Sequence, residues 1–364
     1  MQCRRRGNTG FEISALGFGA MRLPVAEEKK VDRPAAIRAI QRAFELGVNY
    51  VDSAFGYHYG ESEEVIGEAL KGEWRGKVRI ATKNPYKGPS GEEWNGNLDT
   101  QLRRLGVDHI HYYLMHGLAW QEYSEGVTAP GGPLEMAHRA REQGKIGRLC
   151  LSCHDTPENM IRLIDTGEFA TITLQYNLLD RANEPVIEHA VRKGVGVVVM
   201  GPVGGGRLVP PSERVRAMIP GGARSTPEVA LRFVLSNPGV SAAISGMGSV
   251  EQVEENAATC SREEPLSAEE KAHVLRALEE TRKLADLYCT GCNYCMPCPN
   301  EVNIPRAFSL MNLHRVYGLT ASARRGYAWK RTAEKCVECG ECEPKCPQKI
   351  PIIERLKEVA EALG

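Results

Sequence analysis

The first 260 or so residues repeat one pattern: apolar residues at helical spacing, then a glycine, then a short apolar run typical of a buried strand. Ile37, Ile40 and Phe44, for example, precede Gly47 and the apolar run 48–51. The pattern predicts strands at 13–18, 48–51, 78–81, 110–114, 149–151, 171–174, 195–199 and 240–244. Alternating βα units require a parallel sheet, and this number of strands favours a closed (β/α)₈ TIM barrel of the α/β class over an open, doubly wound sheet.

Composition and charge indicate a globular chain without a charge bias. Of the 364 residues, 42% are hydrophobic and 25% are charged, which is sufficient for a sizeable core. Lys+Arg and Asp+Glu both number 46, so no net positive field attracts nucleic acid or anionic lipid. No apolar run reaches the roughly eighteen residues of a membrane span, and the basic start at 4–6 lacks the apolar core of a signal peptide. We therefore expect a cytoplasmic protein that binds neither nucleic acid nor membrane.

Polar residues lie where several predicted strands end, and barrels of this kind carry their active sites at the C-terminal ends of the strands. Asp52 ends the second strand, Lys83 the third and His116 the fourth. Tyr57 lies in the loop after Asp52. Each residue alone has an ordinary structural interpretation, such as a helix cap or a core side chain. Their combined occurrence predicts a catalytic group at this end of the barrel.

With these residues the chain resembles the aldo-keto reductases, over residues 1 to about 260. The motifs that carry the resemblance are Arg6-Gly7-Asn8-Thr9-Gly10, Gly17-Phe18-Gly19, Asp52-Ser53-Ala54, Gly60-Glu61-Ser62-Glu63, Ala81-Thr82-Lys83, Leu114-Met115-His116, Gln175-Tyr176-Asn177 and the segment 230–235. The resemblance implies a catalytic tetrad made of Asp52, Tyr57, Lys83 and His116.

The implied tetrad suits the reduction of a carbonyl group by hydride. Negative charge develops on the carbonyl oxygen, so the reaction needs a proton donor, and Tyr57 is the expected general acid. An ammonium beside a phenol favours the ionised phenol, which is the role expected of Lys83, and Asp52 would hold Lys83 charged and oriented. His116 is expected to donate a hydrogen bond that positions the carbonyl oxygen.

The resemblance also implies a site for a nicotinamide coenzyme, NAD(H) or NADP(H). Its carboxamide would contact two side chains, although the family's usual Ser-Asn pair reads Ser152-Cys153 here. The glycine-rich segment 201–208 resembles the family's pyrophosphate loop, because glycines let backbone N–H groups approach phosphate closely; the alternative is a flexible loop. The implied coenzyme-binding residues are Ser152, Gln175, Gly201, Gly204, Gly205, Gly206 and, against adenine, Asn256.

The segment 244–252 departs from the pattern of NADP-dependent members. The family usually supplies a lysine or serine and then an arginine here, which grip the 2′-phosphate, whereas this chain has no basic residue at these positions. The departure favours NADH or another phosphate-bearing cofactor such as FMN, unless Arg207 or Arg214 supplies the missing charge.

The cysteines are concentrated near the C-terminus, after a charged helix that we predict from Ser267 to about 287. A long chain without a signal peptide is more typical of metal binding than of disulfides. The first run has the spacing C-x₂-C-x₂-C-x₂-C-P, and the second, C-x₂-C-x₂-C-x₃-C-P, is the bacterial ferredoxin signature. The predicted metal ligands are Cys289, Cys292, Cys295, Cys298, Cys336, Cys339, Cys342 and Cys346.

Two such runs resemble the two-cluster ferredoxins, in which three thiolates of one run hold a [4Fe-4S] cluster and the fourth crosses to the other cluster. The resemblance implies that Cys346 completes the cluster of the first run and that Cys298 completes the second. Paired zinc sites are the alternative, since four cysteines with short gaps also suit tetrahedral zinc, but a Cys-Pro end to each run is typical of ferredoxins. We predict a barrel domain at 1–262 and a small α-helical, ferredoxin-like iron–sulfur domain at 263–364.

Three functions follow from this combination. We favour an iron–sulfur oxidoreductase that reduces a small carbonyl-type substrate while two clusters relay electrons to or from a one-electron carrier protein, with FMN in the glycine-rich loop as a bridge between two-electron and one-electron chemistry. The second is a conventional NAD(P)H-dependent carbonyl reductase with structural clusters, and the third is a non-catalytic redox sensor or accessory subunit. The intact tetrad argues against the third. Side chains predicted to line the substrate pocket are Met21, Tyr86 and Trp120.

Overall fold

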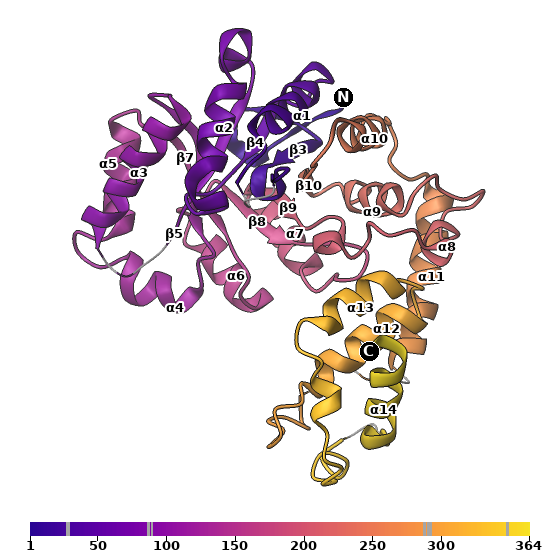
Figure 1. Ribbon diagram of the computed structural model, residues 1–364. Coiled ribbons are helices and arrows are strands. Elements are labelled where there is room, and N and C mark those ends of the chain that lie inside the picture. Colours follow the sequence, from indigo (N-terminus) through magenta and orange to yellow (C-terminus); the bar gives the residue numbers. More distant parts are fainter. Residues whose placement is uncertain (27–29, 86–87, 89, 287–288, 290–292, 347–348) are drawn as a thin grey trace. The chain divides into compact units, whose positions relative to one another are not determined.

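The structure is a computed structural model that describes residues 1–26, 30–85, 88, 90–286, 289, 293–346 and 349–364. It divides into two compact units, coloured along the chain in Figure 1. The first contains Met1–Pro202 and Leu231–Pro265, and the second contains Val203–Ala230 and Leu266–Gly364. This division differs from the predicted one at 262 and 263, because residues 203–230 group with the C-terminal residues. None of the described helices has the length and apolar character needed to cross a membrane.

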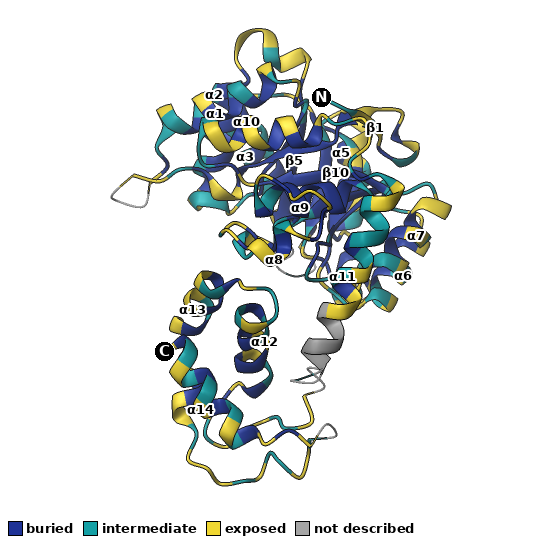
Figure 2. Cartoon of the chain, turned by 90° about the vertical axis from the view of Figure 1, so that its right-hand side faces the viewer, coloured by how far each residue is buried: buried dark blue, intermediate teal, exposed yellow. Residues whose placement is uncertain are grey.

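Eight parallel strands of the first unit close into a barrel, in the order β10-β3-β4-β5-β6-β7-β8-β9. The strands are β3 (Leu16–Gly19), β4 (Tyr50–Asp52), β5 (Arg79–Pro85), β6 (Ile110–His116), β7 (Ile146–Ser152), β8 (Thr171–Gln175), β9 (Gly196–Met200) and β10 (Val240–Ser245). Each contains residues of a predicted strand, so the prediction of a (β/α)₈ barrel is confirmed. Figure 2 shows these strands as the buried centre of the unit. Buried residues that pack together here are Ile13, Tyr50, Ala81, Tyr112, Leu114, Cys150, Val198, Ala242 and Ile244.

Helices follow the strands along the chain and end where the glycine pattern predicts. Gly47, Gly106, Gly144 and Gly194 have φ between 61° and 88°, a left-handed conformation that stops a helix and that glycine adopts without a steric penalty. The helices before and within the barrel repeats are α1 (Arg33–Glu45), α2 (Glu61–Ala69), α3 (Gly91–Leu105), α4 (Trp120–Glu122), α5 (Pro133–Glu142), α6 (Pro157–Asp165), α7 (Glu184–Arg192), α9 (Thr226–Leu235) and α10 (Val250–Cys260). Short 3₁₀ or π turns are η1 (Gly7–Thr9), η2 (Ala20–Arg22), η3 (Tyr57–Gly60), η4 (Gly72–Gly76), η5 (Tyr123–Val127), η6 (Gly204–Gly206) and η7 (Thr332–Lys335).

The predicted opening strand at 13–18 is wrong as a single element. Its first part, β2 (Glu12–Ser14), pairs antiparallel with β1 (Cys3–Arg5), and only β3 joins the barrel. The hydroxyl of Ser14 donates a hydrogen bond to the carbonyl of Leu16 at 2.6 Å, which closes a local turn between the two strands. The apolar run continues through this turn because Ala15 is also buried, so the sequence pattern gives no sign of the break.

The second unit is helical and contains α8 (Glu213–Arg216), α11 (Ala268–Asp286), α12 (Ile304–Arg315), α13 (Thr320–Ala328) and α14 (Ile352–Leu363). Helix α12 packs against both α13 and α14, with Phe308 and Leu310 buried. Helix α11 begins as predicted, with a reciprocal cap in which Ser267 and Glu270 each accept a backbone N–H of the other. Residues 203–230 contact the C-terminal part of this unit through Ser212, whose hydroxyl donates to the carbonyl of Tyr317 at 2.6 Å.

Candidate active site

The barrel brings the four predicted tetrad residues together at the C-terminal end of its strands. Asp52 ends β4, Lys83 lies in β5, His116 ends β6, and Tyr57 begins the turn η3 that follows β4. The ammonium of Lys83 forms an ion pair with the carboxylate of Asp52 and lies 3.5 Å from the hydroxyl of Tyr57. The rings of Tyr57 and His116 meet edge to face, with centroids 5.9 Å apart. The four groups therefore form one continuous cluster.

Burial distinguishes the charged pair from the tyrosine and the histidine. Asp52 and Lys83 are buried, whereas Tyr57 and His116 are partly exposed. Lys83 also donates to the carbonyl of Ser53 at 2.7 Å, which fixes its ammonium below the tyrosine. Burial works to lower the pKa of Lys83, but the Asp52 carboxylate and the Tyr57 hydroxyl together raise it. Burial raises the pKa of Asp52, and the ammonium of Lys83 opposes that shift. The lysine is therefore a fixed cation beside a phenol that solvent and substrate can reach.

His116 is a neutral hydrogen-bond donor in this arrangement. Burial lowers its pKa to about 4, with further lowering by Lys83 and His154. Near neutral pH the imidazole is consequently uncharged, and one ring N–H remains to donate. His154 was not predicted as part of the site, although its place two residues after the end of β7 is the signal that could have found it.

A buried polar network supports the strand that carries Lys83. The carboxylate of Glu63, which has no exposed surface, accepts hydrogen bonds from Thr82 Oγ1 at 2.6 Å, from Gln101 Nε2 at 2.5 Å and from Arg104 Nη1 at 3.2 Å. Gln101 also donates to the backbone carbonyl of Lys83 at 3.2 Å. Glu63 belongs to a motif that the sequence singled out, but its supporting role depends on contacts that only the fold creates.

The coenzyme residues implied for the first unit lie at the ends of further strands. Ser152 ends β7 and Gln175 ends β8. The hydroxyl oxygen of Ser152 accepts the backbone N–H of Gly117 at 2.9 Å, so it also holds the loop after His116. Gly201 has φ of 62°, and a methyl group placed on it would lie 3.0 Å from Oε1 of Gln175. Gly201 therefore leaves room for the Gln175 side chain.

At the predicted 2′-phosphate segment, two polar side chains are already engaged by the backbone. Ser249 caps α10 by accepting the N–H of Gln252, and Oε1 of Gln252 accepts the N–H of Gly248 at 2.8 Å. Asn256, the implied adenine contact, is buried and donates to the hydroxyl of Ser245 at 3.2 Å.

An arginine from another part of the barrel lies beside the same segment. A methyl group on Gly246 would lie 2.7 Å from Cβ and 2.9 Å from Cγ of Arg22, an exposed residue of η2. Arg22 was not predicted from the sequence, because 224 positions separate it from Gly246 along the chain. Of the two arginines that were predicted instead, Arg214 donates to the carbonyl of Val316 at 3.2 Å, and Arg207 belongs to the second unit.

Two of the residues predicted for the substrate pocket are described. Met21 is 55% exposed on η2. Trp120 begins α4, where its ring lies under the guanidinium of Arg162, with 4.0 Å from Cζ to the ring centroid. Tyr86 lies outside the described residues.

Five of the predicted metal ligands lie together in the second unit. One cavity is lined by Cys295 and Cys298 of the first run and by Cys336, Cys339 and Cys342 of the second. Both Cys295 and Cys298 thus lie beside the three closely spaced cysteines of the other run, whereas the implied assignment takes only Cys298 across. Cys289 and Cys346 do not line this cavity, and Cys292 lies outside the described residues. In the described part of the chain, no group of three His, Cys, Asp or Glu side chains is spaced to hold a single metal ion.

A parallel barrel with a buried lysine–aspartate pair beside a tyrosine, joined here to a cysteine-rich helical unit, is the arrangement that the sequence predicts for an oxidoreductase. The model of the aldo/keto reductase family matches residues 15–279, and that of the 4Fe-4S dicluster domain matches residues 288–350. The chain belongs to the aldo/keto reductase family and carries a 4Fe-4S dicluster domain, so both predicted resemblances are confirmed.

Relatives with described activities match more than two thirds of this chain. The NADH-specific methylglyoxal reductase of Escherichia coli is 27% identical over 69% of this chain and 91% of its own length. L-galactose dehydrogenase of Arabidopsis thaliana is 28% identical over 78% of this chain and 96% of its own length. An aldo-keto reductase from Bacillus halodurans, solved in its holo form, has a TM-score of 0.66 and 29% identity over 76% of this chain and 96% of its own. These matches give no support to FMN, and we do not retain it as a cofactor.

Proposed function

We propose that this chain reduces a small carbonyl compound with a nicotinamide coenzyme and Tyr57 as the general acid, and that its two [4Fe-4S] clusters exchange electrons with a one-electron carrier protein. The contact that carries the first part is the 3.5 Å approach of the buried Lys83 ammonium to the Tyr57 hydroxyl. The second part is supported by the cavity that Cys298 shares with the closely spaced cysteines of the second run.

The proposed reaction balances without a further reactant. A nicotinamide coenzyme would supply the hydride to the carbonyl carbon, with Ser152 and Gln175 as the residues implied to hold its carboxamide. The Tyr57 hydroxyl gives its proton to the carbonyl oxygen, which yields the alcohol and the oxidised coenzyme. The fixed ammonium of Lys83 stabilises the phenolate left behind, and neutral His116 donates a hydrogen bond that orients the oxygen without adding charge. Tyr57 recovers its proton from solvent, which its partial exposure permits.

We expect NADH to bind at least as tightly as NADPH. The segment 246–252 has no basic side chain, and Ser249 and Gln252 are engaged by the backbone, so the 2′-phosphate gains no charge-assisted bond from it. Titration of the full chain with both coenzymes measures this, with methylglyoxal as the first carbonyl substrate because a similar protein reduces it with NADH. NADPH binding about tenfold or more tighter would contradict the prediction. Arg22→Gln would then show whether the arginine beside Gly246 is the cause.

Protein purified without oxygen is expected to contain about eight irons per chain, four for each cluster. Cys298→Ala removes a proposed ligand of the second cluster, so it should lower the iron content to about four. Cys260→Ala is the matched control, because this cysteine is buried in the barrel unit and should leave the iron content unchanged. Zinc in place of iron, or an unchanged iron content in the Cys298 variant, would contradict the ligand assignment.

The same proteins test the electron relay. Each [4Fe-4S] cluster accepts one electron, so reduced methyl viologen should pass about two electrons per chain to the wild-type protein and about one to Cys298→Ala. Both proteins should still reduce the carbonyl with NADH, because the hydride comes from the coenzyme. If the wild-type protein with all its iron accepts no electrons from the dye, the clusters are structural and the chain is a conventional carbonyl reductase.

A further inference from the structure

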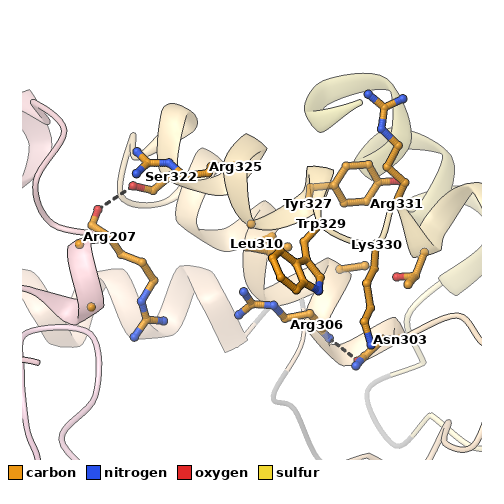
Figure 3. Close-up of a pocket in the computed structure, with 15 residues that line it drawn as sticks. Arg207, Asn303, Arg306, Leu310, Ser322, Arg325, Tyr327, Trp329, Lys330 and Arg331 are labelled. Carbon is orange, nitrogen blue, oxygen red and sulfur yellow. Dashed lines mark hydrogen bonds between the residues drawn. The ribbon is translucent and has the colours of Figure 1, made fainter. Parts of the chain in front are cut away.

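A cavity of about 500 Å³ lies entirely within the second unit, away from the cysteine-lined cavity. One wall is the glycine-rich turn at 205–207, and the others are the first turns of α12, the body of α13 and the segment 329–332 (Figure 3). Its volume falls within the roughly 300–1,000 Å³ that small-molecule sites occupy. The walls from α12 onward belong to the 4Fe-4S dicluster domain rather than to the part of the chain that the aldo/keto reductase family covers.

The cavity has a strongly positive lining. Arg207, Arg306, Arg325, Lys330 and Arg331 contribute cationic side chains, and no Asp or Glu is among the described residues that line it. Arg331 lies 3.8 Å from the carboxylate of Glu334, an exposed residue that does not line the cavity. This contact neutralises little of the positive charge. The first turn of α12 also borders the cavity, so the positive end of a twelve-residue helix adds to the field. Positive charges that are concentrated in a concave site favour the binding of an anion.

The backbone and the packing hold these groups in place. Ser322 of α13 donates to the carbonyl of Arg207 at 2.9 Å, which fixes the glycine-rich turn against that helix. Gly205 has φ of 66°, and a methyl group built on it would meet nothing within 4 Å, so its backbone is open to a ligand. A methyl group on Gly326 would lie 2.7 Å from Leu310 Cδ2 and 3.4 Å from Arg306 Nη2. The glycine thus makes room for the guanidinium of Arg306 beside α13.

An aromatic side chain completes the cavity. Trp329 is 84% exposed, although an indole is among the most favourable groups to bury. Figure 3 shows its ring between the side chains of Arg306 and Lys330. An exposed indole among cations offers a face on which a planar base stacks while phosphate groups meet the positive charges.

We propose that this cavity binds a nucleotide through its diphosphate, with phosphate on Arg306 and Lys330 and with the base on Trp329. The nucleotide is a ligand other than the coenzyme, so the inference goes beyond the proposed function and does not rest on it. The side chains that would hold the nucleotide all belong to the second unit.

The test is calorimetric titration of the full, iron-loaded chain with inorganic pyrophosphate and with ADP. Both should bind, and Arg306→Gln should weaken both by about tenfold or more, since it removes a charge-assisted contact. Trp329→Ala should weaken ADP and leave pyrophosphate unchanged. Arg276→Gln is the matched control, because this exposed arginine of α11 does not line the cavity. Lys330→Gln replaces Arg306→Gln if iron content or helical circular dichroism shows that the Arg306 variant does not fold.

Competition with NADH distinguishes this cavity from the coenzyme site. ADP should bind without displacing NADH, and Arg306→Gln should leave KM for NADH unchanged. If ADP binds only in competition with NADH, it occupies the coenzyme site and the inference is overturned. Binding of ADP in a chain that shows no NADH-dependent reduction would end the proposed function and leave this inference standing. Pyrophosphate and ADP that fail to bind, or that bind equally well to the Arg306 and Lys330 variants, would overturn it.

Discussion

Tyr57→Phe is expected to lower the rate of carbonyl reduction by about 10²- to 10⁴-fold, the range usually lost with a general acid. The substitution removes only the hydroxyl that lies 3.5 Å from the Lys83 ammonium, and it keeps the ring that packs edge to face on His116. Coenzyme binding should therefore change by less than about twofold. Steady-state rates with methylglyoxal and coenzyme titrations on the same preparation measure the two effects.

A second tyrosine, Tyr59, provides the control for Tyr57→Phe. Tyr59 lies on the same turn and is 95% exposed, so Tyr59→Phe removes an equivalent hydroxyl that makes no contact with Lys83. It should leave the rate unchanged. Lys83→Met should shift the pH profile of reduction, because the fixed cation beside the acid is lost, and Asp52→Asn should shift it less. A Tyr57→Phe enzyme with a rate within about twofold of wild type would remove this residue from the mechanism.

Glu63→Ala is expected to destabilise the barrel unit by about 3–5 kcal/mol, the usual cost of breaking a buried ionic contact by removing one partner. The carboxylate has no exposed surface and accepts hydrogen bonds from Thr82, Gln101 and Arg104. Its loss removes one acceptor from each of these donors and opens a cavity between α2, α3 and β5. Denaturant unfolding followed by circular dichroism measures the change.

Two further substitutions distinguish the loss of the buried carboxylate from a general effect of substitution in α2. Glu64→Ala, one position along α2, removes an ion pair with Arg33 in which both side chains are more than a third exposed, and it should cost at most about 1 kcal/mol. Glu63→Gln keeps the side-chain volume and an acceptor oxygen, so its effect should lie between the other two. Equal unfolding midpoints for Glu63→Ala and Glu64→Ala would show that the network does not support the barrel.

The amino-acid sequence was sufficient to predict the barrel and the types of residue at the C-terminal ends of its strands. Glycines that stop helices are local features, since the left-handed conformation at Gly106 or Gly144 depends on the residue itself. The cysteine spacing is also local, because three thiolates within seven residues reach one cluster whatever surrounds them. In the same way, Asp52 and His116 are placed by their strands, whose parallel ends must meet at one rim.

What the sequence by itself determined about this protein is therefore its barrel, the four polar residues that meet at one end of it and its two cysteine runs. Only the tertiary structure decided the contacts between residues far apart in the chain. The approach of Arg22 to Gly246, the donors around Glu63 and the grouping of 203–230 with the C-terminal helices all belong to this second class. The cationic cavity around Arg306 and Trp329 does as well. The physical reason is that hydrophobic periodicity records which face of an element is buried, whereas the partner of a polar side chain is set by how separate elements pack.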